Sequence, residues 1–216
     1  MICTSKLARV ALVLLVSLAA PDAGAQETDG PQDLDARVQQ FLDEHHNQWH
    51  DANVPSADGQ LLYDLVLSNG YTQALEIGTS TGHSAIWIAW ALSKTGGKLI
   101  TIEIDESRYL QALDSFEAAG LSDYIDARLA DAHDLVLELE GPFDFVFLDA
   151  DKDWYARYFE AVFPRLEVGG CFTAHNVSGR RMRGIDAFME KLESTANLET
   201  EIVRASHSGM SVSYKK

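Results

Sequence analysis

The stretch FDFVFLDADKDWY, residues 143–155, is the part of this 216-residue chain that decides its fold. It begins as an apolar run, which is typical of a strand buried on both faces of a sheet, and then breaks into acidic residues and a lysine. In an open α/β sheet, ligands bind just beyond the carboxyl ends of the strands, where the strand order reverses. We therefore expect the charged residues after this run to lie at a ligand site.

Short apolar runs of the same kind alternate with segments of helical spacing. Strands are predicted at residues 74–77, 98–104, 125–129, 143–149 and 170–175. Helices are predicted at residues 34–50 and 58–70, and then near 83–94, 106–119, 132–139 and 152–165. Strands and helices that alternate in this way predict a mostly parallel sheet with helices on both faces.

The C-terminal part follows a different pattern. One more helix is predicted at residues 182–195, followed by apolar runs at 198–205 and 209–216. These last two runs are close enough in sequence to pair as an antiparallel hairpin at one edge of the sheet. The fold class predicted from the residues is thus α/β, with a seven-stranded sheet that ends in this hairpin.

The composition limits the kinds of partner. The formal net charge is −16 and the isoelectric point is about 4.6, which argues against a broad basic surface for nucleic acid. With 46% hydrophobic and 23% charged residues, the chain has the composition of one folded domain. We therefore expect no nucleic-acid partner.

The first 25 residues have the form of a secretory signal peptide. Lys6 and Arg9 precede an apolar core that is too short to span a bilayer comfortably, and Ala23 and Ala25 form an A-x-A cleavage frame. Residues 26–33 look like a polar linker before a domain at 34–216. This pattern predicts an exported chain, periplasmic or secreted, with no stable membrane insertion after cleavage; a membrane-anchored or cytoplasmic chain is the alternative.

The turn after the first predicted strand carries the pattern of a ligand-binding loop. Gly78 and Gly82 allow a tight turn and a close approach of backbone N–H groups to a ligand, and Ser80 and Ser84 add hydroxyls at the start of the next helix. A dinucleotide fingerprint would have glycine in place of Ser80, so NAD is not favoured. Glu103 ends the next strand, where an acid accepts hydrogen bonds from ribose, although a solvated strand end is the alternative. Together these features suit an adenosine-containing ligand without pyrophosphate, such as S-adenosylmethionine.

Six motifs together resemble a known family. GQLLYDLV, ALEIGTSTGHSAIWIA, TIEIDESR, FDFVFLDADKDWY, GGCFTAHN and GMSVSYKK occur in the order found in class I S-adenosylmethionine-dependent O-methyltransferases of the catechol and caffeoyl-CoA type. The resemblance runs from about Val54 to the C-terminus. It implies a Rossmann-like methyltransferase fold, S-adenosylmethionine as methyl donor, a small catechol-like or phenolic acceptor, a divalent metal, and a possible homodimer.

The resemblance also implies roles for individual residues. Near the methyl donor it implies three groups: Glu76, Gly78, Ser80, Gly82 and Ser84 at the methionine and the turn, Glu103 at the ribose, and Ala132 with His133 at the adenine. Asp149 would border the donor and be the first metal ligand, and Lys152 would be the catalytic base. A metal ion on Asp149 would lower the pKa of a phenol, and Lys152 would accept its proton.

Two aromatic residues near Lys152 have two possible roles each, and one acid has a structural role. Trp154 and Tyr155 would wall an aromatic acceptor, or would belong to the buried face of the next helix. Asp151 is interpreted as a helix cap, without a role in catalysis.

One position departs from the family pattern. The family commonly has Asp-Asn after the fifth strand, and this chain has His175 and Asn176. A neutral imidazole in place of a carboxylate should weaken magnesium and favour manganese, iron, zinc or nickel. His175 and Asn176 are therefore candidate metal ligands, with metal-free catalysis that uses His175 as a hydrogen-bonding or basic group as the competing hypothesis.

Other candidate sites are weaker. His46 and His50 have helical i, i+4 spacing, but a solvated helix face is the simpler interpretation. The stretch SGRRMRG at 178–184 is basic and lies near the predicted site, where it could contact an anionic group.

Two functions are consistent with the sequence. The first is an S-adenosylmethionine-dependent O-methyltransferase of class EC 2.1.1, and the alternative is an exported non-catalytic protein that binds a small molecule or nucleoside on the same fold. The joint presence of Glu103, Asp149 and Lys152 favours the enzyme.

Overall fold

The computed structural model describes residues 31–49, 52–178 and 184–216. The predicted signal peptide, His50 and the arginines Arg180, Arg181 and Arg183 lie outside the described residues. The first helix, α1, begins at Pro31, so the last three residues of the predicted linker are helical.

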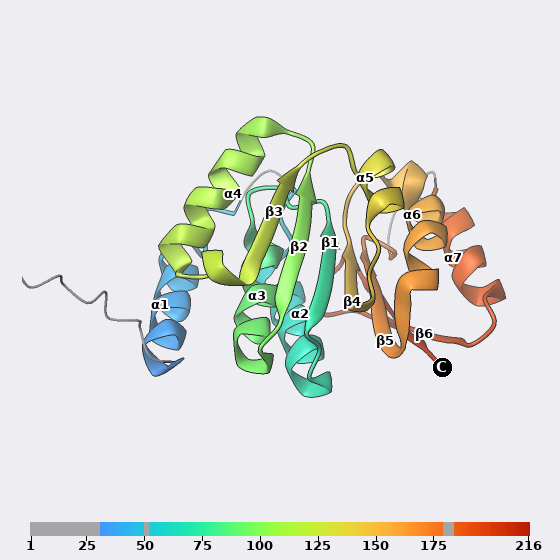
Figure 1. Cartoon of the computed structure of the whole chain (residues 1–216), viewed down its shortest axis with the longest axis horizontal. Helices are drawn as coiled ribbons and strands as arrows, with labels where there is room; N and C mark the ends of the chain where they lie inside the picture. Colours follow the sequence, from blue (N-terminus) through green and yellow to red (C-terminus); the bar gives the residue numbers. More distant parts are fainter. Residues whose placement is uncertain (1–30, 50–51, 179–183) are drawn as a thin grey trace, which may run out of the picture.

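Seven strands form one sheet in the order β3-β2-β1-β4-β5-β7-β6 (Figure 1). Their bounds are β1 Gln73–Ile77, β2 Lys98–Glu103, β3 Ile125–Leu129, β4 Phe143–Leu148, β5 Leu166–His175, β6 Leu198–Val203 and β7 Met210–Lys215. The first five strands are parallel, and β7 pairs antiparallel with both β5 and β6. The predicted fold class, including the edge hairpin, is confirmed.

Helices cover both faces of the sheet. They are α1 Pro31–Glu44, α2 Ser56–Asn69, α3 His83–Thr95, α4 Glu106–Ala119, α5 Ala132–Glu138, α6 Tyr155–Val162 and α7 Ile185–Ser194. Strand β4 shows how the two cores arise from alternating residues. Phe145 and Phe147 pack with α1 to α4 on one face, whereas Val146 and Leu148 pack with α5 to α7 on the other, and all four are fully buried.

Two predicted helices differ from the observed ones. The helix expected at 34–50 ends at Glu44, where His45, His46 and Asn47 follow; residues of these types have only modest helix propensity. His46 therefore lies outside the helix that would have paired it with His50. The helix expected at 152–165 is an α-helix only over Tyr155–Val162, with a short 3₁₀ turn at each end.

Strand register brings four residues into one row. Ile77 of β1 pairs with Ile102 of β2 and with Leu148 of β4, and Leu148 pairs with Ala174 of β5. The next residue in each strand is Gly78, Glu103, Asp149 and His175. Because the four strands are parallel, these residues meet at the same edge of the sheet, where the strand order reverses between β1 and β4.

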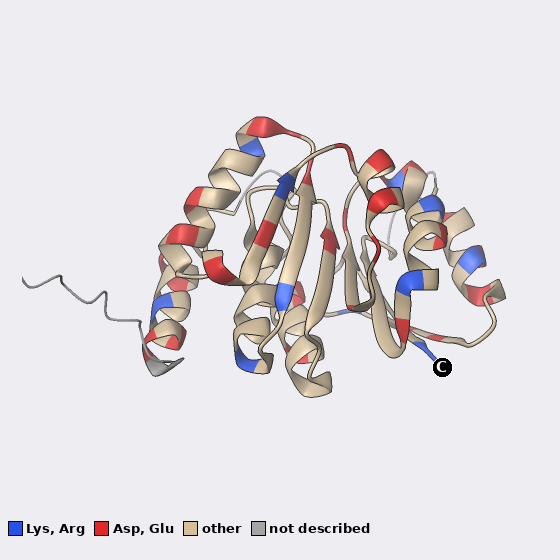
Figure 2. Cartoon of the chain, in the orientation of Figure 1, with Lys and Arg blue, Asp and Glu red and all other residues tan. Residues whose placement is uncertain are grey.

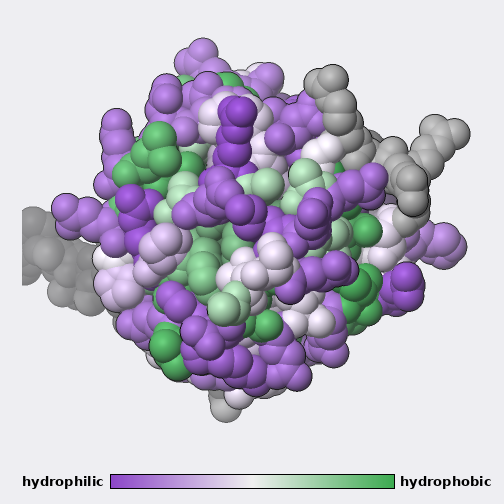
Figure 3. Space-filling model, turned by 90° about the vertical axis from the view of Figure 1, so that its right-hand side faces the viewer, coloured by the Kyte–Doolittle hydropathy of each residue, from purple (hydrophilic) through white to green (hydrophobic). Residues whose placement is uncertain are grey.

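The surface is polar and mixed in charge. Acidic and basic residues are interspersed over the helices and strands, and acidic ones are more frequent (Figure 2). On the face seen in Figure 3, hydrophilic residues predominate, and apolar ones show in small patches among them. Within the described part of the chain, the structure contains no helix with the length and apolar character needed to cross a membrane.

The packing of α2 on α3 depends on a glycine. A Cβ atom on Gly59 would overlap the indole ring of Trp87, so only glycine lets the two helices approach this closely. Asp58, the preceding residue, is fully buried. The close approach of α2 therefore also decides where the Asp58 carboxylate lies.

We predict that Gly59→Ala destabilises the fold even though alanine is the better helix former. The gain in helix propensity is about 1 kcal/mol, whereas overpacking of a tight contact costs about 1–3 kcal/mol. Urea unfolding should show a lower free energy of unfolding than for Gln60→Ala, the matched change at an exposed position of α2. A Gly59→Ala variant as stable as the Gln60→Ala variant would contradict this account of the packing.

Candidate active site

A cavity of about 610 Å³ lies at the carboxyl ends of the parallel strands. Most of the residues predicted for the site line it: Gly78, Ser80, Glu103, Ala132, His133, Asp149, Lys152, His175 and Asn176. The cavity is also lined by Asn53 and Arg108, which the sequence analysis did not single out. Its volume lies within the range of about 300–1,000 Å³ that is usual for small-molecule sites.

The turn after β1 packs against the end of β4. Gly78 has φ 100°, and a Cβ atom there would lie 2.5 Å from the carbonyl oxygen of Asp149, so the position requires glycine. Gly82 has φ 101° and precedes α3, where a Cβ atom would meet the Phe116 ring at 2.7 Å. Gly82 therefore shapes the start of α3 and does not line the cavity.

Glu103 presents a carboxylate that the backbone holds in place. Its Oε2 accepts a hydrogen bond from the N–H of Ser80 at 2.7 Å, and its Oε1 accepts from the N–H groups of Ile104 at 3.1 Å and Asp105 at 3.0 Å. The side chain is nearly buried but borders the cavity. A carboxylate fixed in this way can accept further hydrogen bonds from a ligand without reorienting.

Glu76 and Ser84 lie beneath the cavity and do not line it. Glu76 is fully buried, and its Oε2 accepts a hydrogen bond from the Thr101 hydroxyl at 2.5 Å. Burial raises the pKa of Glu76 to about 8, although hydrogen bonds from Ser84 and Thr101 act in the opposite direction. Glu76 is thus mainly protonated at neutral pH and supports the turn from below.

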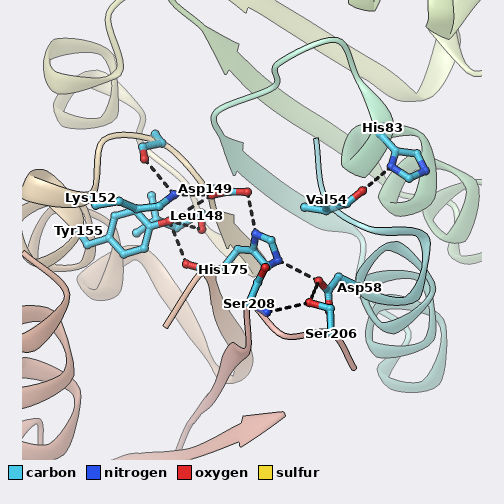
Figure 4. Close-up of polar contacts among 11 residues, drawn as sticks. Val54, Asp58, His83, Leu148, Asp149, Lys152, Tyr155, His175, Ser206 and Ser208 are labelled. Atoms are coloured by element: carbon cyan, nitrogen blue, oxygen red, sulfur yellow. Dashed lines mark hydrogen bonds and ion pairs between the residues drawn. The ribbon is translucent and has the colours of Figure 1, made fainter. Parts of the chain in front are cut away.

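Asp149 is held between two cationic side chains (Figure 4). Lys152 donates from Nζ to Asp149 Oδ1 at 2.5 Å, and the Nδ1 of His175 lies 3.0 Å from Asp149 Oδ2. Burial by itself raises the pKa of Asp149, but the hydrogen bond from His175 and the charge of Lys152 outweigh it, so the pKa is lowered. Both carboxylate oxygens are therefore engaged by the protein.

The other nitrogen of His175 faces a second carboxylate. His175 Nε2 lies 2.9 Å from Oδ2 of Asp58, and the Ser206 hydroxyl donates to the same oxygen at 2.5 Å (Figure 4). Burial lowers the pKa of His175, but its hydrogen bonds to Asp149 and Asp58 have the larger combined effect and raise that pKa to about 9. His175 is therefore an imidazolium at neutral pH.

The sequence analysis did not identify Asp58. In the sequence it is an acid in the first turn of a helix, a common position for a residue that only complements the helix dipole. It reaches His175 from 117 positions away because α2 packs close to the sheet. No spacing in the sequence relates the two residues.

The two predicted acceptor contacts lie elsewhere. Tyr155 is fully buried in α6, and its hydroxyl lies 3.2 Å from the carbonyl oxygens of Leu148 and His175. Trp154 stacks on His133 with ring centroids 3.7 Å apart and does not line the cavity. Tyr155 therefore contacts the ends of β4 and β5 from inside the fold, and Trp154 lies against the ring of His133, which itself lines the cavity.

Two further residues lie close to this site. Asp151 caps the short helix after β4, since its side chain accepts from the N–H of Asp153 at 3.0 Å, as predicted. His83 packs away from the cavity, between the Trp49 ring and the carbonyl oxygen of Val54.

A family model described as O-methyltransferase matches residues 33–199, which is more than half of the chain. This chain belongs to the O-methyltransferase family. The resemblance drawn from the motifs is confirmed.

Curated relatives of this O-methyltransferase family member match over part of their length. A catechol O-methyltransferase from Niastella koreensis is 39% identical over 107 residues, which is 48% of this chain and 48% of the relative. Caffeoyl-CoA O-methyltransferase 1 from Zea mays is 35% identical over 128 residues, 56% of this chain and 49% of the relative. The chain thus spans about half the length of these curated relatives.

Solved structures match more completely. An O-methyltransferase from Bacillus cereus in complex with SAH has a TM-score of 0.71 and 28% identity, over 85% of this chain and 90% of that one. The O-methyltransferase TomG from Streptomyces achromogenes in complex with SAM has a TM-score of 0.70 and 25% identity, over 85% of this chain and 90% of that one.

The predicted metal ligands of this family member do not fit a divalent ion. Each nitrogen of His175 lies within hydrogen-bonding distance of a carboxylate oxygen, so the imidazole has no lone pair free for coordination. Asp149 is engaged at both oxygens. Within the ranges described, no group of three or more His, Cys, Asp and Glu side chains is arranged to hold a metal ion. Asn176 borders the cavity, but a single amide oxygen does not make a metal site.

We predict that Glu76 makes the stability of the chain depend on pH. The pKa of Glu76 is about 8 in the fold and near 4.5 in the unfolded chain. Glu76 therefore contributes to the free energy of unfolding in full below pH 4.5, and this contribution is lost as the pH rises through 8. Glu76→Gln keeps the size of the side chain but cannot ionise.

Urea unfolding at pH 5 and pH 9 measures this effect. The free energy of unfolding of Glu76→Gln relative to the native chain should rise between the two pH values. For Glu138→Gln, a change at an exposed position, the difference should stay constant. The same constant difference for Glu76→Gln would show that Glu76 is ionised throughout.

Proposed function

We propose that this chain transfers a methyl group from S-adenosylmethionine to a hydroxyl of a small catechol-like or phenolic acceptor. Its family, the relatives named as catechol and caffeoyl-CoA O-methyltransferases, and the neighbours solved with SAM and SAH support this function. The observation that carries the proposal is that one cavity is bordered both by the fixed Glu103 carboxylate and by the Lys152 ammonium. The first is suited to a ribose and the second to a phenolic oxygen.

The donor would occupy the part of the cavity near β1 and β2. Glu103 would accept hydrogen bonds from the ribose hydroxyls, since three backbone N–H groups already orient its carboxylate. Ala132 and His133 at the start of α5 would border the adenine, and the turn at Gly78 and Ser80 would accommodate the methionine part. These residues come from the ends of three parallel strands, so the sheet itself fixes their spacing.

The acceptor would lie beside Lys152. Methyl transfer is an in-line displacement, in which the acceptor oxygen forms a bond to the methyl carbon as the bond from that carbon to the sulfonium sulfur breaks. A phenol reacts well only after it loses its proton. The Lys152 ammonium first gives up its proton to solvent; the neutral amine then accepts the proton of the phenol. The ammonium formed in this way stays next to the phenolate until the methyl ether and S-adenosylhomocysteine have formed.

Asp149 orients the base. Its Oδ1 holds Lys152 Nζ at 2.5 Å, and the carbonyl oxygen of Ala150 accepts from the same Nζ at 3.2 Å. These two contacts fix the long lysine side chain at the cavity wall. A positioned base of this kind is more effective than a mobile one, because the reacting atoms already lie in the correct geometry.

We predict that Lys152→Ala lowers kcat by roughly 10²–10⁴-fold, the usual contribution of a general base. The affinity for S-adenosylmethionine, measured by calorimetry, should be unchanged because Lys152 faces the acceptor. The control is Lys98→Ala, at an exposed position where β2 begins, at the opposite end of the strand from the cavity. Equal losses of donor affinity and kcat in Lys152→Ala would exclude Lys152 as the base.

We predict that Glu103→Gln weakens the binding of S-adenosylmethionine by roughly 10–100-fold, since hydrogen bonds to a charged group contribute about 1.5–3 kcal/mol. Calorimetry with the donor alone tests this without any acceptor. Glu106→Gln, the same change at an exposed position of α4, should bind the donor like the native chain. Unchanged affinity in Glu103→Gln would contradict the ribose assignment.

A further inference from the structure

Four charged side chains form one connected row at the bottom of the cavity. Lys152 contacts Asp149, Asp149 contacts His175, and His175 contacts Asp58 (Figure 4). The side chains of His175 and Asp149 are only 4% and 11% exposed, and Asp58 is 0% exposed. Interactions between charges are strong at this depth because water screens them poorly.

The charges in this row balance. Two carboxylates, Asp58 and Asp149, face two cations, Lys152 and His175, so the net charge is zero. A divalent cation needs an excess of negative charge among its ligands. Adding one here would put two positive charges into a row that is already neutral.

The geometry of His175 also argues against a metal ion at this position. Its two nitrogens lie 3.0 Å from Asp149 and 2.9 Å from Asp58, and an ionised carboxylate offers no proton of its own. Each contact is therefore an N–H donated by the imidazole ring. A histidine that donates from both nitrogens cannot coordinate a metal ion, because coordination uses a nitrogen lone pair.

Among the residues that the structure describes, His175 is the only cationic side chain that contacts Asp58. Its Oδ2 also accepts from the Ser206 hydroxyl, and its Oδ1 has no hydrogen-bond partner among the described residues. Removing one partner of a buried ion pair is costly because it leaves an uncompensated charge. The buried Asp58 therefore keeps the His175 ring in place as a cation.

We propose that His175, fixed between Asp58 and Asp149, occupies the position of a divalent cation, so that methyl transfer by this chain requires no metal. His175 acts as a positioning residue. It holds the Asp149 carboxylate, and that carboxylate in turn holds Lys152 at the acceptor. This inference rests on the proposed methyl transfer for its catalytic consequence, but the misfit of a divalent ion at these four side chains follows from their charges alone.

The proposal is tested by titrating the full chain with Mn²⁺ and following free Mn²⁺ by electron paramagnetic resonance. The native chain should bind no Mn²⁺ in the cavity, and its transfer of methyl groups to a simple catechol should be the same in a chelator as in added magnesium. Stoichiometric binding of one Mn²⁺ to the native chain, or loss of transfer in the chelator that magnesium restores, would overturn the proposal.

The variant His175→Asp tests the proposal in the opposite direction, because it should create a metal site. It turns the row into three carboxylates and one lysine, with a net charge of −2, which a divalent cation matches. We expect it to gain one bound Mn²⁺ per chain and a transfer rate that rises on addition of metal. His207→Asp is the matched control, because it makes the same change of residue at an exposed position near Ser206 and should gain no Mn²⁺.

The outcomes separate this inference from the proposed function. The Mn²⁺ titration needs neither methyl donor nor acceptor, so it decides the role of His175 even if no acceptor is methylated. If His175→Asp does not fold, the two measurements on the native chain still decide. A folded His175→Asp variant that binds no Mn²⁺ would show that charge balance does not govern metal binding here, and would overturn the proposal.

Discussion

The ion pairs of His175 with Asp149 and Asp58 are the interactions on which the candidate site depends. They connect the end of β5, the end of β4 and the first turn of α2, which come from distant parts of the chain. Since His175 and Asp58 are buried and Asp149 is only 11% exposed, loss of any one of them would leave a charge poorly compensated. The position of Lys152, and with it the proposed acceptor site, follows from this arrangement.

The parallel register of the sheet makes these contacts possible. Gly78, Glu103, Asp149 and His175 each follow a residue that is in register with its neighbours across β2, β1, β4 and β5, so the pairing of the sheet places the four at the same edge. The absence of a side chain at Gly78 lets the turn after β1 approach the Asp149 backbone. The proposed donor and acceptor sites therefore lie side by side on a rigid scaffold. Helix α2 adds Asp58, which contacts His175 from the side away from Asp149.

Much of this could be predicted from the sequence. The alternation of apolar runs and helical segments predicted the sheet and the edge hairpin, since burial on both faces requires continuous apolar strands such as residues 143–148. The rule that ligands bind at carboxyl ends of strands located Glu103, Asp149 and Lys152 at the cavity. Helix ends were less predictable: α1 stops at Glu44, because the histidines beyond it provide little helix propensity.

The sequence by itself determined the order of strands and helices, the glycine turn after β1 and the residue types that meet at the cavity, because these depend on local periodicity and on which residues end a strand. Only the tertiary structure decided what those residues do. It placed Glu76, Ser84 and Tyr155 beneath the cavity. It also brought Asp58 to His175, which turned a predicted metal ligand into a hydrogen-bonded cation. The reason is that the protonation of a histidine depends on its neighbours in space, and packing between distant segments selects them.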